Sequence, residues 1–262
     1  MDLKALLWAA LALQLAWAQP LPPAAQALYD KSRVRTRHQL LQAPAIEATS
    51  DGQSFVAIWE ARPNPKKWIV SLHGSRGLAT EEMAVWQPHL KDRQVGLLCL
   101  QWRLGEGDGT RDYMTPEVIY REVDLALQRH GVAAGQVLLH GFSRGSTQTF
   151  ALAALDVFSR RRYFDLVVAS SGGVSEGYPP TRDLLLGKFG PRPLQGTRWV
   201  TAAGAQDENP ERDGIPAMRR TAEWLRDQGA VVVDTIEVAE EGHGALQRSS
   251  KAMNRLLKLF LP

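Results

Sequence analysis

The sequence has a single cysteine, Cys99, and this scarcity excludes a whole class of small secreted scaffolds. One cysteine has no partner for an intramolecular disulfide, so the fold cannot depend on a disulfide framework. Cys99 lies in the apolar run 95–100, where we expect a buried structural thiol and not a reactive one.

The sequence also lacks a large excess of either positive or negative charge. The chain has 31 Lys and Arg against 28 Asp and Glu, a net charge of +3. This excess is too small to predict a nucleic-acid partner or a membrane-binding face. No internal repeat and no second domain are evident. With 262 residues, of which 44% are hydrophobic and 23% charged, the chain suits one large α/β domain.

Long apolar runs are absent except at the N-terminus. Residues 1–18 contain Lys4, the run LLWAALALQLAWA and a final Ala16-Trp17-Ala18, the A-x-A signature of a cleavage site. The run is too short for a comfortable transmembrane helix. We predict a cleaved signal peptide at 1–18, with a buried or interfacial helix as the alternative, and no stable membrane insertion afterwards. Secretion without a disulfide framework favours a bacterial periplasm or exterior.

Residues 19–47 are predicted to be a leader or connector that precedes the main domain at 48–262. Three prolines open this segment, and five basic residues follow: Lys31, Arg33, Arg35, Arg37 and His38. A solvated segment is the default interpretation. A basic lip that contacts substrate is the alternative.

Strand and helix patterns alternate along 48–262. This alternation predicts a mostly parallel sheet with helices on both faces and ligands at the carboxyl ends of the strands. Between 174 and 196 we expect one short helix, which leaves room for only a minimal lid and favours an open cleft. Strands are expected at 54–59, 67–72, 94–102, 137–139, 166–170, 199–203 and 231–238, and helices at 80–90, 115–130, 146–158, 181–186, 211–227 and 245–260.

A G-x-S-x-G motif, Gly141 to Gly145, stands between an apolar strand and a helical run. This strand–turn–helix context is that of a nucleophile elbow, which predicts Ser143 as the nucleophile. A serine in so tight a turn adopts a strained backbone, and the residues two positions away must be small. The alternative is an ordinary glycine-rich turn.

A second motif, His73-Gly74-Ser75-Arg76-Gly77, directly follows the strand expected at 67–72. In a fold with a nucleophile elbow, a loop at this place supplies one oxyanion N–H, and the residue after the nucleophile, Arg144, supplies the other. We expect the Ser75 backbone N–H to be the first donor, with Arg76 as the fallback and His73 as a scaffold residue. A plain glycine turn is the alternative.

A serine nucleophile needs a general base, and the chain has six histidines. Only His243 lies between two glycines after the last predicted strand, where the strand ends converge, so we predict that it is the base. His140 is expected to be packed and hydrogen-bonded. Solvated or capping roles are ordinary for the three others, His38, His89 and His130.

The acid that orients the base is expected at the end of the preceding strand. Asp207 lies there and gives the chain order Ser, Asp, His. Glu208 is a neighbouring rival and Glu176 a weaker one. Asp108, in the glycine-rich loop 103–112, could bind a cation or reach the site. A turn residue is the preferred interpretation, since no spaced set of acidic ligands follows it.

These motifs together resemble the α/β-hydrolases, and most closely single-domain secreted esterases of the polyhydroxyalkanoate-depolymerase and feruloyl-esterase group. The resemblance covers residues 50–260 and is carried by HGSRG, GFSRGS, GAQDEN and EGHG. It implies a nucleophile, base and acid at Ser143, His243 and Asp207, and an oxyanion hole made by the N–H groups of Arg144 and Ser75. A cramped lid region and the charge of Arg144 depart from a typical member, and they leave the substrate class open.

The resemblance implies hydrolysis of carboxylic esters through an acyl-enzyme, without cofactor or metal. The partner would be a small-molecule or oligomeric ester, with no nucleic acid. A serine peptidase of the same fold and a non-catalytic binding protein on this scaffold are the alternatives. Acyl specificity cannot be read from the sequence. Arg76, Arg103 and Arg144 could attract an acidic acyl group, although exposed arginines are usually just solvated.

Overall fold

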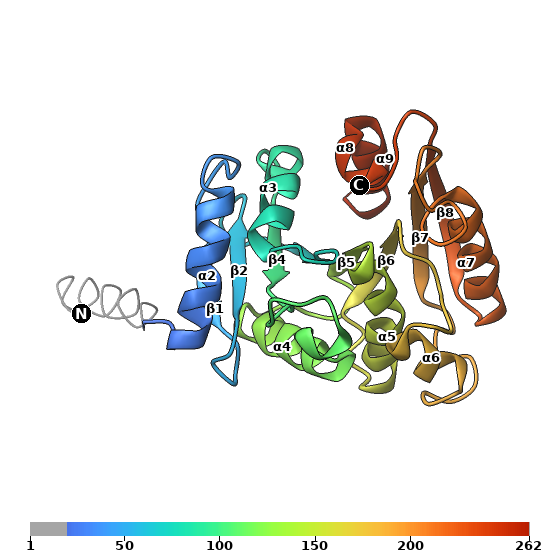
Figure 1. Cartoon of the computed structure of the whole chain (residues 1–262), viewed down its shortest axis with the longest axis horizontal. Coiled ribbons are helices and arrows are strands. Elements are labelled where there is room, and N and C mark those ends of the chain that lie inside the picture. Colours follow the sequence, from blue (N-terminus) through green and yellow to red (C-terminus); the bar gives the residue numbers. More distant parts are fainter. Residues whose placement is uncertain (1–19, 262) are drawn as a thin grey trace, which may run out of the picture.

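The centre of the molecule is an eight-stranded sheet with the order β1-β2-β4-β3-β5-β6-β7-β8. The computed structural model describes residues 20–261 (Figure 1). From β3 to β8, neighbouring strands pair in parallel, whereas β1 and β2 add an antiparallel edge. The expected parallel sheet is therefore confirmed, with an antiparallel extension. Its strands are β1 (Ala45–Ala48), β2 (Phe55–Glu60), β3 (Lys67–Leu72), β4 (Val95–Leu100), β5 (Val137–Phe142), β6 (Phe164–Ser170), β7 (Arg198–Gly204) and β8 (Val231–Val238).

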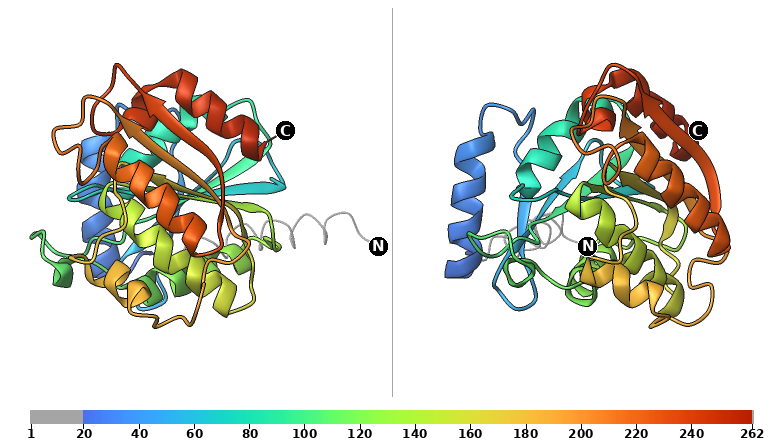
Figure 2. Two further views of the ribbon diagram at one scale, coloured as in Figure 1. Left: turned by 90° about the vertical axis from the view of Figure 1, so that its right-hand side faces the viewer. Right: turned by 45° about the vertical axis from the view of Figure 1, so that its right-hand side comes forward.

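Helices cover both faces of this sheet (Figures 1 and 2). One apolar core lies between the sheet and α3, α8 and α9, with α2 outside α3. The second core lies between the opposite face and α4, α5, α6 and α7. The bounds are α2 (Pro23–Thr36), α3 (Ala79–Leu90), the 3-10 turn η1 (Thr110–Asp112), α4 (Pro116–Arg129), α5 (Arg144–Phe158), α6 (Pro179–Leu185), α7 (Ile215–Asp227), α8 (Ala245–Arg248) and α9 (Ser250–Phe260).

The predicted connector, 19–47, is more ordered than a solvated leader. Its residues 23–36 form α2, which begins with Pro23 in the first turn, a position that proline favours. The hydroxyl of Thr36 donates to that of Thr80 on α3 at 2.8 Å, and Ala25 is fully buried. β1 then pairs with β2 in the sheet. The segment thus contains a helix and a strand that the sequence did not indicate, while its five basic residues are exposed. The predicted signal peptide, 1–18, lies outside the described residues.

The largest differences from the expected helix bounds, at the last two helical segments, have local reasons. The predicted helix 245–260 is split at Ser249, whose hydroxyl accepts from the Ala252 N–H and caps α9. The helix expected from residue 211 begins only at Ile215, with Pro216 in its first turn.

Between 174 and 196 the only helix is α6, which agrees with the expected minimal lid. Among the helices of residues 20–261, none has the length and apolarity that crossing a membrane requires.

Candidate active site

Ser143 is the single residue between β5 and α5, and its backbone is strained. Its φ is 53° and its ψ −116°, in a region that non-glycine residues rarely adopt. The Ser143 N–H donates to the Ser170 carbonyl at 2.8 Å, which fastens the turn to β6. The helix starts at Arg144, two residues earlier than the sequence indicated. The turn is therefore as tight as the motif predicted.

The glycines on either side of Ser143 are required by close backbone contacts. A Cβ on Gly145 would lie 2.3 Å from the carbonyl oxygen of Leu72 on β3. A Cβ on Gly141 would lie 2.2 Å from the carbonyl oxygen of Gly145. Neither space admits a side chain without moving backbone, so β3, β5 and α5 can approach this closely only with glycine at both positions.

The structure brings Ser143, His243 and Asp207 into one hydrogen-bonded chain. His243 Nδ1 lies 2.9 Å from Asp207 Oδ2, and its Nε2 lies 3.0 Å from Ser143 Oγ. A carboxylate only accepts hydrogen bonds, so Nδ1 carries the proton and Nε2 is free to accept from the serine hydroxyl. In this arrangement His243 can act as a general base toward Ser143 while Asp207 holds its ring in place.

Asp207, and not Glu208, is the carboxylate that contacts the histidine. Asp207 is buried, and its second oxygen accepts from the Asn209 backbone N–H at 2.9 Å. Both carboxylate oxygens are thus engaged, and the side chain is fixed toward His243. Glu208 and Glu176 are exposed on the surface. The geometry therefore favours the first of the three candidate acids.

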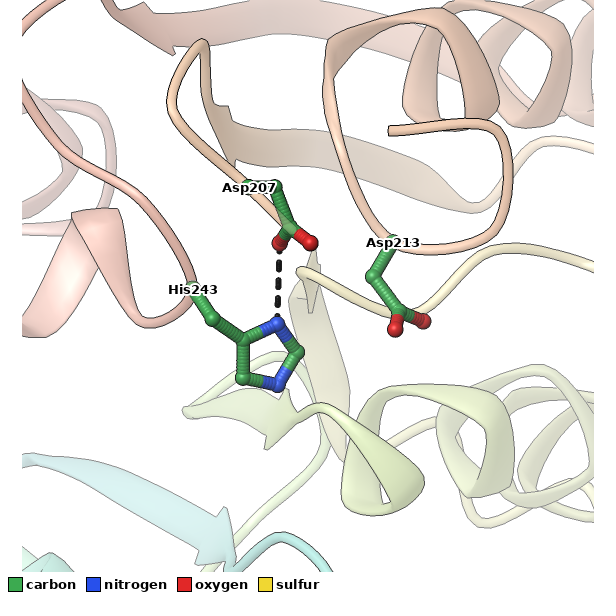
Figure 3. Close-up of side chains that lie close together, drawn as sticks. All are labelled: Asp207, Asp213 and His243. Carbon is green, nitrogen blue, oxygen red and sulfur yellow. Dashed lines mark hydrogen bonds and ion pairs between the residues drawn. The ribbon is translucent and has the colours of Figure 1, made fainter. Parts of the chain in front are cut away.

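A second carboxylate, that of Asp213, lies beside the first, which the sequence analysis did not anticipate. Figure 3 shows it next to Asp207 and His243. One ligand atom from each of the three lies within 4.8 Å of the others. However, Asp213 is already paired with the Arg212 guanidinium at 2.6 Å, and the imidazole bonds to Asp207. The carboxylates and the imidazole therefore already have partners within the protein, and we assign no metal to this group.

The two predicted oxyanion donors belong to different elements, the 73–77 loop and the first residue of α5. The 73–77 loop touches the elbow, because a Cβ on Gly74 would lie 3.1 Å from Ser143 Cβ. Among the described residues, no hydrogen-bond acceptor takes the backbone N–H of Ser75 or of Arg144. The fallback donor, Arg76, is committed elsewhere, since its N–H donates to Tyr113 Oη at 2.9 Å. Ser75 and Arg144 are therefore the available pair.

His73 and His140 have the supporting places that the sequence indicated. His73 is 1% exposed, bonds through Nδ1 to the Gly74 carbonyl and stacks on Trp102. Burial lowers the pKa of His73 to about 4, so the ring is neutral and Nδ1 donates. His140 is fully buried and bonded to Ser71 Oγ at 2.8 Å. Neither histidine contacts Ser143.

Asp108 is the residue whose place the sequence analysis missed. It accepts from Tyr113 Oη at 2.6 Å, and its carboxylate lies 3.5 Å from Arg144 Nη1. A turn residue was the preferred interpretation, yet Asp108 contacts the side chain that follows the nucleophile. No local sequence signal marks this contact, because 36 residues separate the two partners.

A cavity of about 470 Å³ opens beside this chain of residues. His243, Ser75 and Phe142 line the side toward the elbow, and Val85 adds an apolar wall. Charged side chains from several elements complete the lining, namely Arg35, Arg76, Glu81, Glu82 and Arg248. The cavity therefore mixes apolar and charged surface and reaches His243, whose ring contacts the Ser143 hydroxyl.

Known structures resemble this fold closely although their sequences differ. A phospholipase/carboxylesterase from Dyadobacter fermentans superposes with a TM-score of 0.54 at 18% identity, over 79% of this chain and 96% of that one. An esterase from the archaeon Pyrobaculum calidifontis gives 0.64 at 12% identity, over 90% of both chains. Fungal esterases from Rhizomucor miehei give 0.62 at 13% identity, over 96% and 94%. No family profile and no curated protein sequence matches the chain.

These likenesses cover 79 to 96% of this chain. At such low identities they show the fold and not the activity. The sheet order, the helices on both faces and these structural neighbours together establish that the chain has the α/β-hydrolase fold.

Proposed function

We propose that this protein is a serine hydrolase that cleaves carboxylic esters through an acyl-enzyme. The observation that carries the proposal is the chain from Ser143 Oγ through the His243 ring to Asp207, with distances of 3.0 and 2.9 Å. The strained elbow supports it, and so does the adjoining cavity, which is lined by Phe142, the residue before Ser143, and by His243, which contacts the Ser143 hydroxyl. The esterases among the structural neighbours favour an ester over a peptide as substrate.

In the proposed reaction, His243 Nε2 takes the Ser143 proton while Oγ attacks the ester carbonyl carbon. The N–H groups of Ser75 and Arg144 hold the negative oxygen of the tetrahedral intermediate. The intermediate collapses when His243 returns the proton to the departing alcohol, which leaves an acyl-serine. Water then attacks the acyl group with His243 again as the base, and the carboxylic acid is released.

The test of the nucleophile uses a fluorophosphonate probe and short p-nitrophenyl esters. Wild-type protein should become labelled on Ser143 and turn over the esters, whereas Ser143→Ala should lose both, with turnover down at least about 10⁴-fold. Mass spectrometry of the labelled peptide identifies the modified residue. A folded Ser143→Ala variant that labels as fast as wild type would falsify the assignment.

A peptide anilide panel separates the ester reading from a peptidase. We expect no peptide turnover, since α6 is the only helix between 174 and 196 and leaves little structure to select a peptide. The likeness of the motifs to polyhydroxyalkanoate depolymerases and feruloyl esterases remains a prediction. Inclusion of hydroxyalkanoate and feruloyl esters in the panel tests it.

We also propose that residues 1–18 direct secretion and are then removed. The support is the A-x-A signature at Ala16 to Ala18. N-terminal sequencing of protein exported from a bacterial host should begin at Gln19. Recovery of the intact N-terminus from the exported fraction would contradict this proposal.

A further inference from the structure

The 103–113 loop, between β4 and α4, is held closed by its own contacts. Arg103 and Tyr113, at its two ends, form an isolated antiparallel bridge. Arg103 is 8% exposed, and its guanidinium donates to the carbonyl oxygens of Glu106 and Gly107 inside the loop. The buried Arg103 side chain therefore ties the loop to its own backbone and fixes the end that carries Tyr113.

This loop hydrogen-bonds to the segment that carries the first proposed oxyanion donor. Tyr113 Oη accepts the Arg76 backbone N–H at 2.9 Å and donates its own proton to Asp108 Oδ1 at 2.6 Å. Arg76 directly follows Ser75 and has a φ of 56°, a left-handed conformation that costs free energy in a non-glycine residue. The tyrosine hydroxyl therefore fixes the peptide next to the Ser75 N–H.

The same loop also contacts Arg144, the residue that carries the second proposed donor. The Arg144 guanidinium lies 4.3 Å above the Tyr113 ring and donates through Nη2 to the Asp108 carbonyl at 2.9 Å. Its Nη1 lies 3.5 Å from the Asp108 carboxylate. The side chain of Arg144 is thus bound to the loop, while its backbone N–H has no acceptor among the described residues.

Aromatic packing supports this arrangement from behind. The Tyr113 ring lies 4.7 Å from that of Trp102, which stacks on His73 at 5.2 Å. Trp102 Nε1 also donates to the His73 carbonyl at 3.2 Å. A continuous column of His73, Trp102, Tyr113 and Arg144 therefore joins the 73–77 loop to the start of α5.

We propose that Tyr113 and Asp108 are positioning residues that hold the two oxyanion donors at the correct spacing. The inference rests on the proposed ester hydrolysis. Donors stabilise a transition state only when they are held in advance within a few tenths of an ångström of the developing charge. Ser75 and Arg144 come from different elements. In the part of the chain that the structure describes, Tyr113 contacts the residue after Ser75, and Asp108 contacts the side chain of Arg144.

The experiment removes only the hydroxyl with Tyr113→Phe, which keeps the ring below Arg144 and beside Trp102. We expect kcat for a short p-nitrophenyl ester to fall about tenfold with KM within twofold, since a loosened donor costs less than the about 10² to 10³-fold loss of a whole one. The inhibition constant of a short-chain trifluoromethyl ketone should rise by a similar factor, because its tetrahedral adduct with Ser143 places an oxyanion between the donors.

A matched control is Tyr163→Phe. It removes a hydroxyl that donates to Asp124 at 2.8 Å, immediately before β6 and therefore at the end of the strands opposite Ser143. This control should keep wild-type kcat and inhibitor affinity. If Tyr113 had a purely structural role, both variants would instead have a lower melting temperature. Their kcat and inhibition constant would then stay at the wild-type values.

Asp108→Asn provides the second variant should Tyr113→Phe not fold. It keeps an oxygen for the tyrosine hydroxyl and removes the charge opposite Arg144, so a smaller, few-fold loss in kcat and in inhibitor affinity is expected. If both variants matched the wild type in kcat and inhibition constant, or changed in KM alone, the positioning role would be overturned. The proposed function would remain intact. A wild-type protein without ester turnover would overturn both.

Discussion

A serine, a histidine and a carboxylate contact one another at two places in this molecule. Ser143, His243 and Asp207 do so at the carboxyl ends of the strands, beside a cavity. The second set is Ser71 on β3, His140 on β5 and Glu82 on α3; it is buried, and only Glu82 borders the cavity. The residue types are almost the same, so the difference between the two clusters isolates what geometry and access contribute.

The order of the contacts differs first. In the outer cluster the histidine is central, with the acid on Nδ1 and the serine on Nε2. In the inner cluster the serine is central: Ser71 Oγ donates to Glu82 at 2.8 Å and accepts from His140 Nδ1 and from Trp86 Nε1. A histidine that donates to a serine cannot take its proton, so the inner cluster lacks a general base toward Ser71.

Burial separates the two clusters further. Burial lowers the pKa of His140 to about 3 and raises the pKa of Glu82 to about 7. His140 and Glu82 lie 3.8 Å apart, yet the histidine is uncharged at neutral pH, and the two do not form an ion pair. The side chain of His243, in contrast, is 37% exposed and reaches the cavity. Residue types alone therefore do not make a catalytic site.

Replacing each acid by its amide should give the largest contrast. Asp207→Asn should lower kcat on p-nitrophenyl esters about 10⁴-fold, because an amide can donate to Nδ1 and hold the wrong tautomer of His243. Glu82→Gln should retain kcat within a few fold.

Glu208→Gln is the control for the outer acid, since its exposed side chain does not contact the histidine. Steady-state kinetics on the three purified variants makes the measurement. If turnover collapsed in Glu208→Gln and not in Asp207→Asn, the acid would have to be reassigned by one position.

The pH dependence of stability should show the cost of burying the inner acid. Burial raises the pKa of Glu82 from its ordinary value of 4.5 to about 7, so between these values the folded state keeps a proton that the unfolded state has lost. The stability of the wild type should therefore fall as pH rises through this window, by up to about 3 kcal/mol from this group, at about 1.4 kcal/mol per pKa unit.

Glu82→Gln has no proton to lose, so its free energy of unfolding relative to wild type should increase from pH 5 to pH 8. Urea denaturation at several pH values measures this difference. The neighbouring titratable groups do not supply a cation, because His140 is neutral and burial raises the pKa of the Cys99 thiol. A difference that stays constant with pH would show that Glu82 ionises normally.

The smallest effect is expected for the inner serine. Ser71→Ala removes the acceptor of Trp86 and His140 and one donor to Glu82, which should cost about 1 to 3 kcal/mol of stability. Activity should stay close to wild type, in contrast to Ser143→Ala. Denaturation and ester turnover on the two alanine variants test this pair, and a loss of activity in Ser71→Ala near that of Ser143→Ala would erase the distinction drawn between the clusters.

The outer cluster was predictable because each member has a local signal. Ser143 lies in a glycine motif between strand and helix, and Asp207 and His243 each follow a strand of the same parallel sheet. Parallel strands bring such residues to one edge whatever their separation in sequence. The inner cluster was less predictable from the sequence. His140 was expected to be packed, but its partners lie on different elements, and no spacing rule links them.

Other features depended on contacts that local patterns do not encode. α2 was missed because its exposed face is basic and its packing on α3 relies on small side chains such as Ala25 and Thr36. The proline at its first position was the available signal. The contact between Asp108 and Arg144 joins residues 36 apart through an irregular loop, so only the folded chain reveals it.

The lone cysteine gives the protein a practical property. Cys99 is fully buried in β4, and burial raises the pKa of its thiol, so it should not react with maleimides while the protein is folded. A cysteine introduced at the surface, for example at Arg111 in the 103–113 loop, would then be the one accessible thiol among the described residues. A fluorophore or spin label attached there would show whether this loop stays fixed during turnover, without a prior cysteine-removal step.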